Sequence, residues 1–93
     1  MKETARRVHA AEGVLVKELD GEGVLLDLGS ETYFGLNRTA FRMWSALTSA
    51  PSIDAALGEL AREYDVDAPA LERDALALVE ALQRHGLVRL AHA

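Results

Sequence analysis

The chain has 93 residues, a formal net charge of −5 and no cysteine. This length corresponds to one domain, near the lower limit at which a single hydrophobic core is stable by itself. The lack of cysteine excludes a disulfide framework, a thiolate zinc site and a cysteine nucleophile. The negative charge argues against a surface that binds nucleic-acid phosphates, since such surfaces carry an excess of Lys and Arg.

Residues 1–12 are mostly polar. They contain no apolar segment of the kind found in signal peptides, and the chain has no run of about 20 apolar residues that could span a membrane. We expect residues 1–12 to form a flexible tail, in which only Val8 is suited to docking on a core, and residues 13–93 to form the domain. The expected location is the cytoplasm, without membrane contact.

Three β-favouring runs follow the tail. Residues 14–19 and 23–28 are separated by a short Gly-containing connection typical of a hairpin. A third run, residues 31–36, follows a Gly-Ser turn pair and contains Thr, Tyr and Phe. The sequence therefore predicts a three-stranded antiparallel meander whose third strand lies at an edge.

The rest of the chain predicts helices. Asn37 has the side chain of a helix N-cap, and Leu36 and Phe41 occupy the two positions of a hydrophobic staple, which predicts a helix over residues 38–48. A serine cap followed by apolar residues at helical spacing predicts a second helix over residues 52–64.

A third helix is predicted to begin after Asp67 and to end at His85. Gly86 and Leu87 fit the glycine and apolar positions of a Schellman motif, in which a left-handed glycine ends the helix. The complete order predicts an α+β fold of the winged helix-turn-helix type, with a three-stranded antiparallel sheet followed by three helices.

A winged helix commonly binds DNA, so a DNA-binding regulator is an alternative function. The third predicted helix would be its recognition helix. That helix carries four acidic residues against two arginines: Asp67, Glu72, Asp74 and Glu80 against Arg73 and Arg84. It would bring net negative charge to the major groove, so the charges argue against this alternative.

The sequence offers no catalytic or metal-binding pattern. His9, His85 and His92 are far apart and form no pair at metal-ligand spacing. None of the four serines stands in a nucleophile motif. We therefore expect no catalytic residue, no metal and no cofactor.

One flank of the third helix is suited to binding another chain. Five apolar residues form its predicted buried face: Leu71, Ala75, Leu78, Val79 and Leu82. Small or short residues lie along the neighbouring flank: Ala70, Asp74, Ala77 and Ala81. If this flank borders the third strand, an extended peptide can add to the sheet there as a fourth strand. Alternatively, the alanines only favour helix formation.

The order of strands and helices and a graded set of motifs make the chain similar to the PqqD-like family. The segments that carry the resemblance are VLLDL (24–28), YFGLN (33–37), Trp44, LAREYDV (60–66), DALAL (74–78), Leu82 and GLV (86–88). The YFGLN segment and Trp44 most resemble the stand-alone precursor-recognition proteins of lasso-peptide biosynthesis. The resemblance covers nearly the whole chain after the expected tail.

This resemblance implies a RiPP recognition element, a non-catalytic module that binds the leader segment of a ribosomally made precursor peptide and delivers it to processing enzymes. The implied partners are the precursor, a leader peptidase and, as a further candidate, the macrolactam-forming cyclase. A PqqD-type peptide chaperone of another RiPP pathway is an alternative. The resemblance implies neither nucleic acid nor membrane as a partner.

In such proteins the leader pairs with the third strand and packs against the third helix. The resemblance therefore implies peptide-binding residues on both elements. On the strand they are Glu31, Thr32, Tyr33, Phe34, Gly35 and Leu36, and on the helix they are Asp74, Ala77, Leu78 and Ala81.

Overall fold

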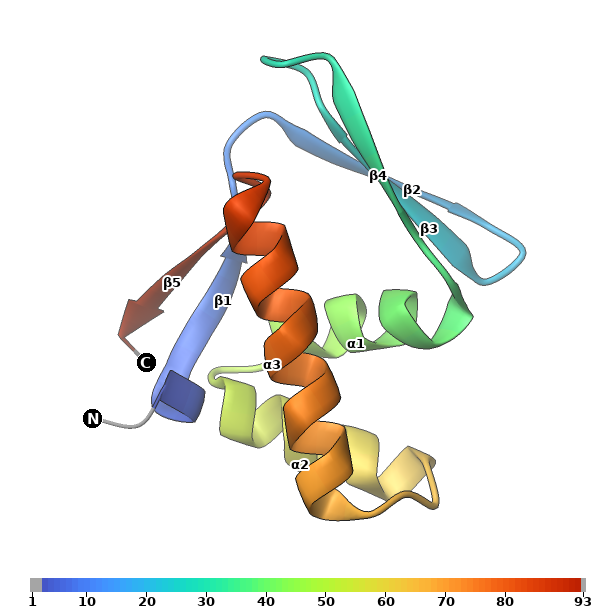
Figure 1. The fold of residues 1–93 in the computed structure, drawn as a ribbon, viewed down its shortest axis with the longest axis vertical. Helices are drawn as coiled ribbons and strands as arrows, with labels where there is room; N and C mark the ends of the chain where they lie inside the picture. The colour runs from blue at the N-terminus through green and yellow to red at the C-terminus, as the bar shows by residue number, and fades with distance from the viewer. Residues whose placement is uncertain (1–2, 93) are drawn as a thin grey trace.

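Two small antiparallel sheets stand on either side of the upper part of a long helix in the computed structural model, which describes residues 3–92 (Figure 1). After a single turn of 3₁₀ helix at Glu3–Ala5, the elements are β1 (Arg6–Ala10), β2 (Val14–Leu19), β3 (Glu22–Asp27), β4 (Thr32–Leu36), α1 (Arg38–Ser49), α2 (Ile53–Glu63), α3 (Ala68–Arg84) and β5 (Val88–His92). The predicted α+β class with a winged helix-turn-helix-type arrangement is confirmed. Within the described residues, no helix combines the length and apolarity needed to cross a membrane.

The predicted meander forms the larger sheet, with strand order β2-β3-β4 and β4 at an edge. The third strand begins one residue later than predicted. Glu31 has φ 58°, so it belongs to the turn before β4 and not to the strand. This left-handed conformation reverses the chain and lets Thr32 pair opposite Asp27.

α1 packs directly on the inner face of this sheet. Leu25 and Leu36 are buried on that face, and Gly23 lies opposite Leu36 in the strand register. A Cβ atom placed on Gly23 would overlap the ring of Phe41 in α1. Only glycine therefore permits the observed approach of α1 to the sheet.

Side-chain caps fix the beginnings of the first two helices as predicted. The Asn37 side chain accepts a hydrogen bond of 2.8 Å from the Ala40 backbone N–H, and α1 begins at the next residue. The Ser52 hydroxyl accepts a hydrogen bond of 3.0 Å from the backbone N–H of Ala55 at the start of α2. Each bond satisfies a backbone donor that the helix itself leaves open.

The predicted Schellman motif ends α3. Gly86 has φ 69°, the left-handed conformation that glycine adopts without steric strain. The Leu87 N–H donates to the Leu82 carbonyl at 2.9 Å, and the Gly86 N–H donates to the Gln83 carbonyl at 3.0 Å. The chain thereby turns out of the helix and enters β5.

The expectation of a flexible tail over residues 1–12 is wrong for residues 6–10. They form β1, which pairs with β5 from Arg6 opposite His92 to Ala10 opposite Val88. Val8 has no exposed surface and belongs to the core. The domain therefore includes this strand, while residues 1, 2 and 93 lie outside the described part of the chain.

The hydrophobic core lies where the three helices meet β1. Trp44 is 4% exposed and belongs to this core. Ile53 and Leu60 of α2 and Val79 of α3 have no exposed surface. Four of the five residues predicted for the buried face of α3 are buried, and the exception, Leu78, is half-buried.

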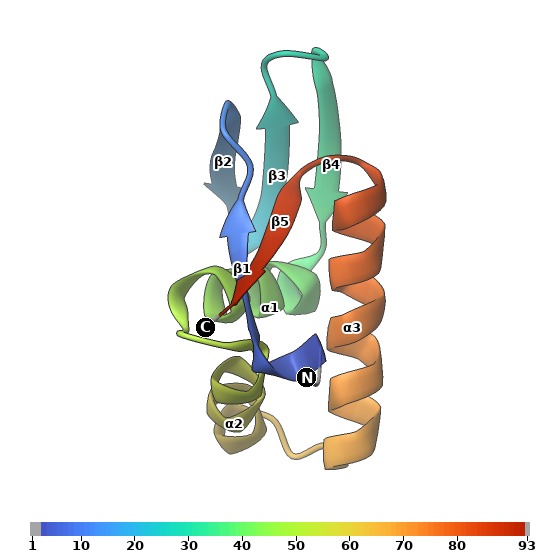
Figure 2. The same cartoon turned by 90° about the vertical axis from the view of Figure 1, so that its left-hand side faces the viewer.

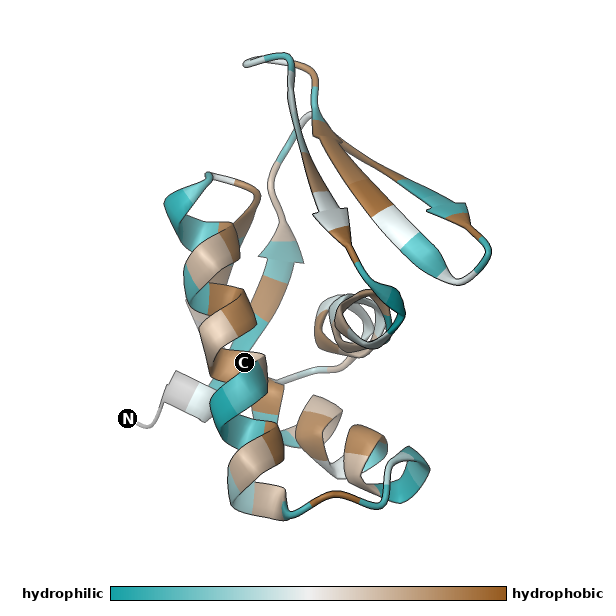
Figure 3. Cartoon of the chain, turned by 45° about the vertical axis from the view of Figure 1, so that its right-hand side comes forward, coloured by the Kyte–Doolittle hydropathy of each residue, from teal (hydrophilic) through white to brown (hydrophobic). Residues whose placement is uncertain are grey.

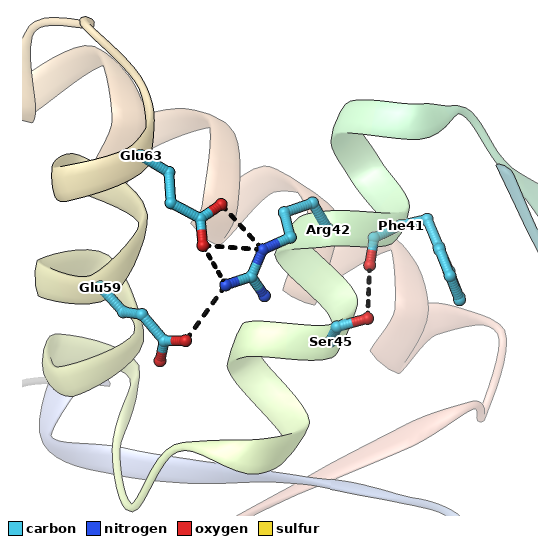
Figure 4. A network of polar contacts seen from close by, with 5 residues as sticks. All are labelled: Phe41, Arg42, Ser45, Glu59 and Glu63. Carbon is cyan, nitrogen blue, oxygen red and sulfur yellow. Dashed lines mark hydrogen bonds and ion pairs between the residues drawn. The ribbon is translucent and has the colours of Figure 1, made fainter. Parts of the chain in front are cut away.

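An ion-pair network joins α1 to α2 (Figure 4). The Arg42 Nη2 atom lies 3.1 Å from Glu59 Oε1, and the Arg42 Nε–H donates to Glu63 Oε2 at 2.8 Å. A second oxygen of Glu63 contacts Arg42 Nη2. Hydrogen bonds from Arg42 lower the pKa of the Glu63 carboxyl, and both carboxylates raise the pKa of Arg42.

Replacing Val8 with Ala should destabilise the fold, because it removes two methyl groups from a fully buried site in β1. We expect a loss of about 2 kcal/mol in the free energy of unfolding and a melting temperature about 10 °C lower in thermal denaturation. Val66→Ala is the control, because its side chain is 52% exposed. Equal melting temperatures for Val8→Ala and the parent would show that β1 contributes little to the core.

The depressed pKa of Glu63 predicts a pH-dependent stabilisation. The carboxylate is more acidic in the folded chain, so its pairing with Arg42 stabilises the fold above the model-peptide pKa of 4.5 and is lost as the pH falls through the lower folded value. Glu63→Gln should lower the melting temperature near pH 7 and have no effect at strongly acidic pH. Melting temperatures are measured by circular dichroism, with Glu72→Gln as the control. A difference in melting temperature between Glu63→Gln and the parent that stays constant down to pH 2 would contradict this prediction.

Candidate functional site

The edge strand β4 provides a row of backbone groups without a strand partner. Its pairing with β3 uses one side only, and within residues 3–92 no strand lies along its other side. Tyr33 projects from the outer face of the sheet and is 78% exposed. A Cβ atom on Gly35 would meet no atom within 4 Å, so the space beside this residue is open. An extended peptide can therefore approach β4 closely.

The inner side of β4 is joined to the end of α3 by an aromatic contact. The rings of Phe34 and His85 are 5.1 Å apart at their centroids and meet edge to face, at an interplanar angle of 67°. His85 is held in place because its Nδ1 atom lies 2.8 Å from the Ala81 carbonyl oxygen. This contact fixes how far β4 stands from the C-terminal end of α3.

The helix residues predicted to bind a peptide form a stripe that ends at this aromatic contact. Asp74, Ala77, Leu78 and Ala81 recur at spacings of three and four, and His85 continues the series. Asp74 and Ala77 are exposed, whereas Leu78 and Ala81 are half-buried. His85 contacts Phe34 of β4, and Asp74 lines a hollow together with Met43 of α1, so the stripe faces β4 and α1. Figure 3 shows the ribbon of α3 beside these two elements.

A small apolar hollow lies at the other end of the stripe, between α1 and the N-terminal half of α3. Its volume is about 110 Å³. Its walls come from α1, from the connection between α2 and α3, and from α3: Thr39, Met43, Tyr64, Val66, Ala70, Leu71 and Asp74. The hollow can take an apolar side chain, and Asp74 can bind a donor at its rim.

Asp74 gives this rim a negative charge that little in the protein neutralises. Its nearest ionic partner is Arg73, whose Nε atom is 4.0 Å from Asp74 Oδ1. Both side chains are largely exposed, at 77% for Arg73 and 65% for Asp74, so the attraction is weak and screened by water. Asp74 therefore remains available to a cationic or hydrogen-bonding group of a ligand.

The structure separates the predicted strand residues into different roles. Tyr33 and Gly35 are exposed beside the free edge, and Phe34 is half-buried under the aromatic contact. Leu36 is only 3% exposed, so it can offer a ligand little more than its backbone. Glu31 lies in the turn, and Thr32 bonds to Ser30 through hydroxyls 2.6 Å apart.

His85 was not among the residues predicted for this site and was considered only as a metal ligand and as the end of the third helix. The helical period indicates His85 as a site residue, because it lies four residues after Ala81 on the same stripe. The hollow was also missed, since Met43 and Val66 reach it from elements that are distant in sequence. Only the packing of α1 against α3 brings them together.

The site has the features of a binding surface. It combines a free strand edge, small side chains on a helix and an apolar hollow, which together suit an extended peptide. Within residues 3–92, no group of three or more side chains of the types that bind metals is assembled.

The chain is closely similar to known proteins. The family of coenzyme PQQ synthesis protein D (PqqD) matches residues 22–88, from β3 to the first residue of β5. No curated protein gave a significant match. Two solved structures are similar over almost their whole length.

The first of these structures is TbiB1 in complex with the TbiA(beta) leader peptide. It is 33% identical to this chain, with a TM-score of 0.81, and the similarity covers 87% of this chain and 94% of that one. The second is lasso peptide synthetase B1 complexed with the leader peptide. It is 31% identical, with a TM-score of 0.80, and the similarity covers 89% of this chain and 98% of that one.

Proposed function

This chain belongs to the PqqD family, and from that premise we propose that it binds the leader segment of a ribosomally synthesised precursor peptide. Both solved relatives are complexes with a leader peptide. The resemblance to PqqD-like RiPP recognition elements is confirmed, and the family assignment supports a non-catalytic module. The observation that carries the proposal is the free edge of β4 beside the small-residue stripe of α3.

The leader adds to β4 as a fourth strand. Alternate side chains of an added strand point to opposite faces of the sheet. Those on the inner face meet Phe34 and the stripe of Ala77, Leu78 and Ala81, and those on the outer face lie beside Tyr33. Further along α3, the hollow receives an apolar side chain and Asp74 receives a hydrogen-bond donor or a cation of the leader.

Affinity in this arrangement depends mainly on a few anchoring side chains. Each backbone hydrogen bond of an added strand contributes about 1 kcal/mol net, and each buried apolar anchor about 2 kcal/mol. Ordering a flexible peptide opposes these gains by several kcal/mol. The backbone pairing therefore sets the register of the leader, and the anchors determine whether it binds.

The bound leader is presented to separate processing enzymes in the cytoplasm, where ribosomal precursors are made. The 31% identity to a lasso peptide synthetase B1 favours lasso-peptide biosynthesis over another RiPP pathway. The partners are then a leader peptidase and the macrolactam-forming cyclase, which supply the chemistry. The leader to test is that of a short precursor encoded near the gene of this chain.

Asp74→Arg should weaken leader binding at least tenfold, about 1.4 kcal/mol, because it places a long cationic side chain at the rim of the hollow. Glu72→Arg is the matched control, because it makes the same charge change at another exposed position of α3. Isothermal titration calorimetry with the leader gives the affinities, and circular dichroism checks that both variants fold. Equal leader affinities for the two variants would show that Asp74 does not belong to the binding site.

Strand addition can be tested on the peptide without changing the protein. In an antiparallel or parallel ladder, only every second residue of an added strand directs its N–H toward the neighbouring strand. Methylation of single backbone nitrogens along the leader should therefore reduce binding severely at alternate positions and mildly between them. A loss of binding that does not alternate would show that the leader does not extend the sheet, even if it binds at this site.

A further inference from the structure

The positive charge of this acidic chain is concentrated on its smaller sheet. β1 and β5 have the sequences RRVHA and VRLAH, with three arginines, two histidines and no acidic residue. The rest of the chain has seven Lys and Arg against fifteen Asp and Glu, a formal charge of −8. The PqqD family match begins at residue 22, so β1 lies outside it.

The strand register places three of these cationic groups on one face. Val8 is opposite Leu90, and Val8 is completely buried, so this pair points into the core. Arg7, His9 and Arg89 have the opposite parity and lie on the face that is turned away from the core, with His9 directly opposite Arg89. Partial desolvation and then the charges of Arg89 and Arg7 lower the pKa of His9, in agreement with this grouping.

These groups lack anionic partners within the described part of the chain. The ion pairs among described side chains involve Arg42 and Arg73, and neither Arg7 nor Arg89 takes part in one. The Arg7 Nε atom is buried without a hydrogen-bond acceptor. Burial of this N–H donor without an acceptor is unfavourable, so the charge of Arg7 is not satisfied within the described residues.

The cationic face is separate from the proposed leader site. Figure 2 shows β1 and β5 in front, whereas β4 and α3 stand at the side of the molecule. A leader strand added to β4 therefore leaves this face uncovered. The two surfaces therefore do not overlap.

We propose that the face of the β1–β5 sheet that carries Arg7, His9 and Arg89 is an interaction surface for a compact cluster of carboxylates on a partner protein. Five residue pairs of a sheet extend over about 17 Å. Duplex DNA carries a charge about every 1.7 Å along its axis, so a helix laid on this face would continue over the acidic remainder of the chain. A short acidic segment matches the face in both size and charge.

Hexaglutamate is a suitable probe because it carries clustered carboxylates without any other recognition feature. In NMR titrations of the full chain at about 20 mM salt, we expect shifts of the backbone amides in β1 and β5 and a rise in the pKa of His9, since bound carboxylates offset the charges of Arg7 and Arg89. Both effects should largely disappear at about 300 mM salt.

Arg89→Glu should weaken hexaglutamate binding about fivefold or more. Arg62→Glu is the matched control, because Arg62 is exposed on α2 and undergoes the same charge change. Neither variant should change the affinity for a leader peptide, so failure of this inference is distinguishable from failure of leader binding.

Three results would overturn the proposal. One is that hexaglutamate shifts no amides of β1 and β5, or binds both variants equally. A second is that a duplex DNA of about ten base pairs binds these strands more tightly than hexaglutamate does, which would make the partner a nucleic acid. The third is that the leader peptide displaces hexaglutamate, which would place both ligands on one site.

Discussion

The packing of Phe41 on the backbone of Gly23 sets the distance between the larger sheet and α1, and the rest of the fold depends on that distance. A single residue, Asn37, separates the end of β4 from the start of α1, so a shift of the helix would also move the edge strand. Arg42, the next residue of α1, holds α2 through Glu59 and Glu63. The free edge of β4 is thus positioned by a rigid chain of contacts and not by β4 alone.

The two sheets divide the surface into regions of different chemistry. On β4, the available groups are mainly backbone, together with the exposed Tyr33 and the open space at Gly35. Backbone pairing does not distinguish one peptide sequence from another, so under the proposed mode selectivity depends on Asp74 and the hollow beside it. On the β1–β5 sheet, the available groups are charged side chains. Under the two proposals, the register of the peptide and the attraction of an acidic partner therefore depend on separate elements.

The sequence predicted the parts of the fold that are specified by neighbouring residues. The Asn37 cap, the Schellman turn at Gly86 and the edge position of β4 depend on residues close together in the chain, and all three are confirmed. β1 was missed because its partner, β5, lies at the other end of the sequence and its five residues carry two arginines and a histidine. In the candidate site, the helical stripe could be predicted from its period, but the hollow and the Phe34–His85 contact could not, because they depend on how α3 packs against other elements.

The pairing of β1 with β5 also has a topological consequence. Arg6 lies opposite His92, so the polypeptide enters and leaves the folded unit at neighbouring points. A unit whose two ends are adjacent can be joined to a larger polypeptide, or inserted into one of its surface loops, with little disturbance to either core. The same architecture is therefore suited to use as a separate chain or as a domain covalently attached to an enzyme. In the attached form the bound peptide would not have to reach the enzyme by diffusion. The linker would instead set its effective concentration at the enzyme.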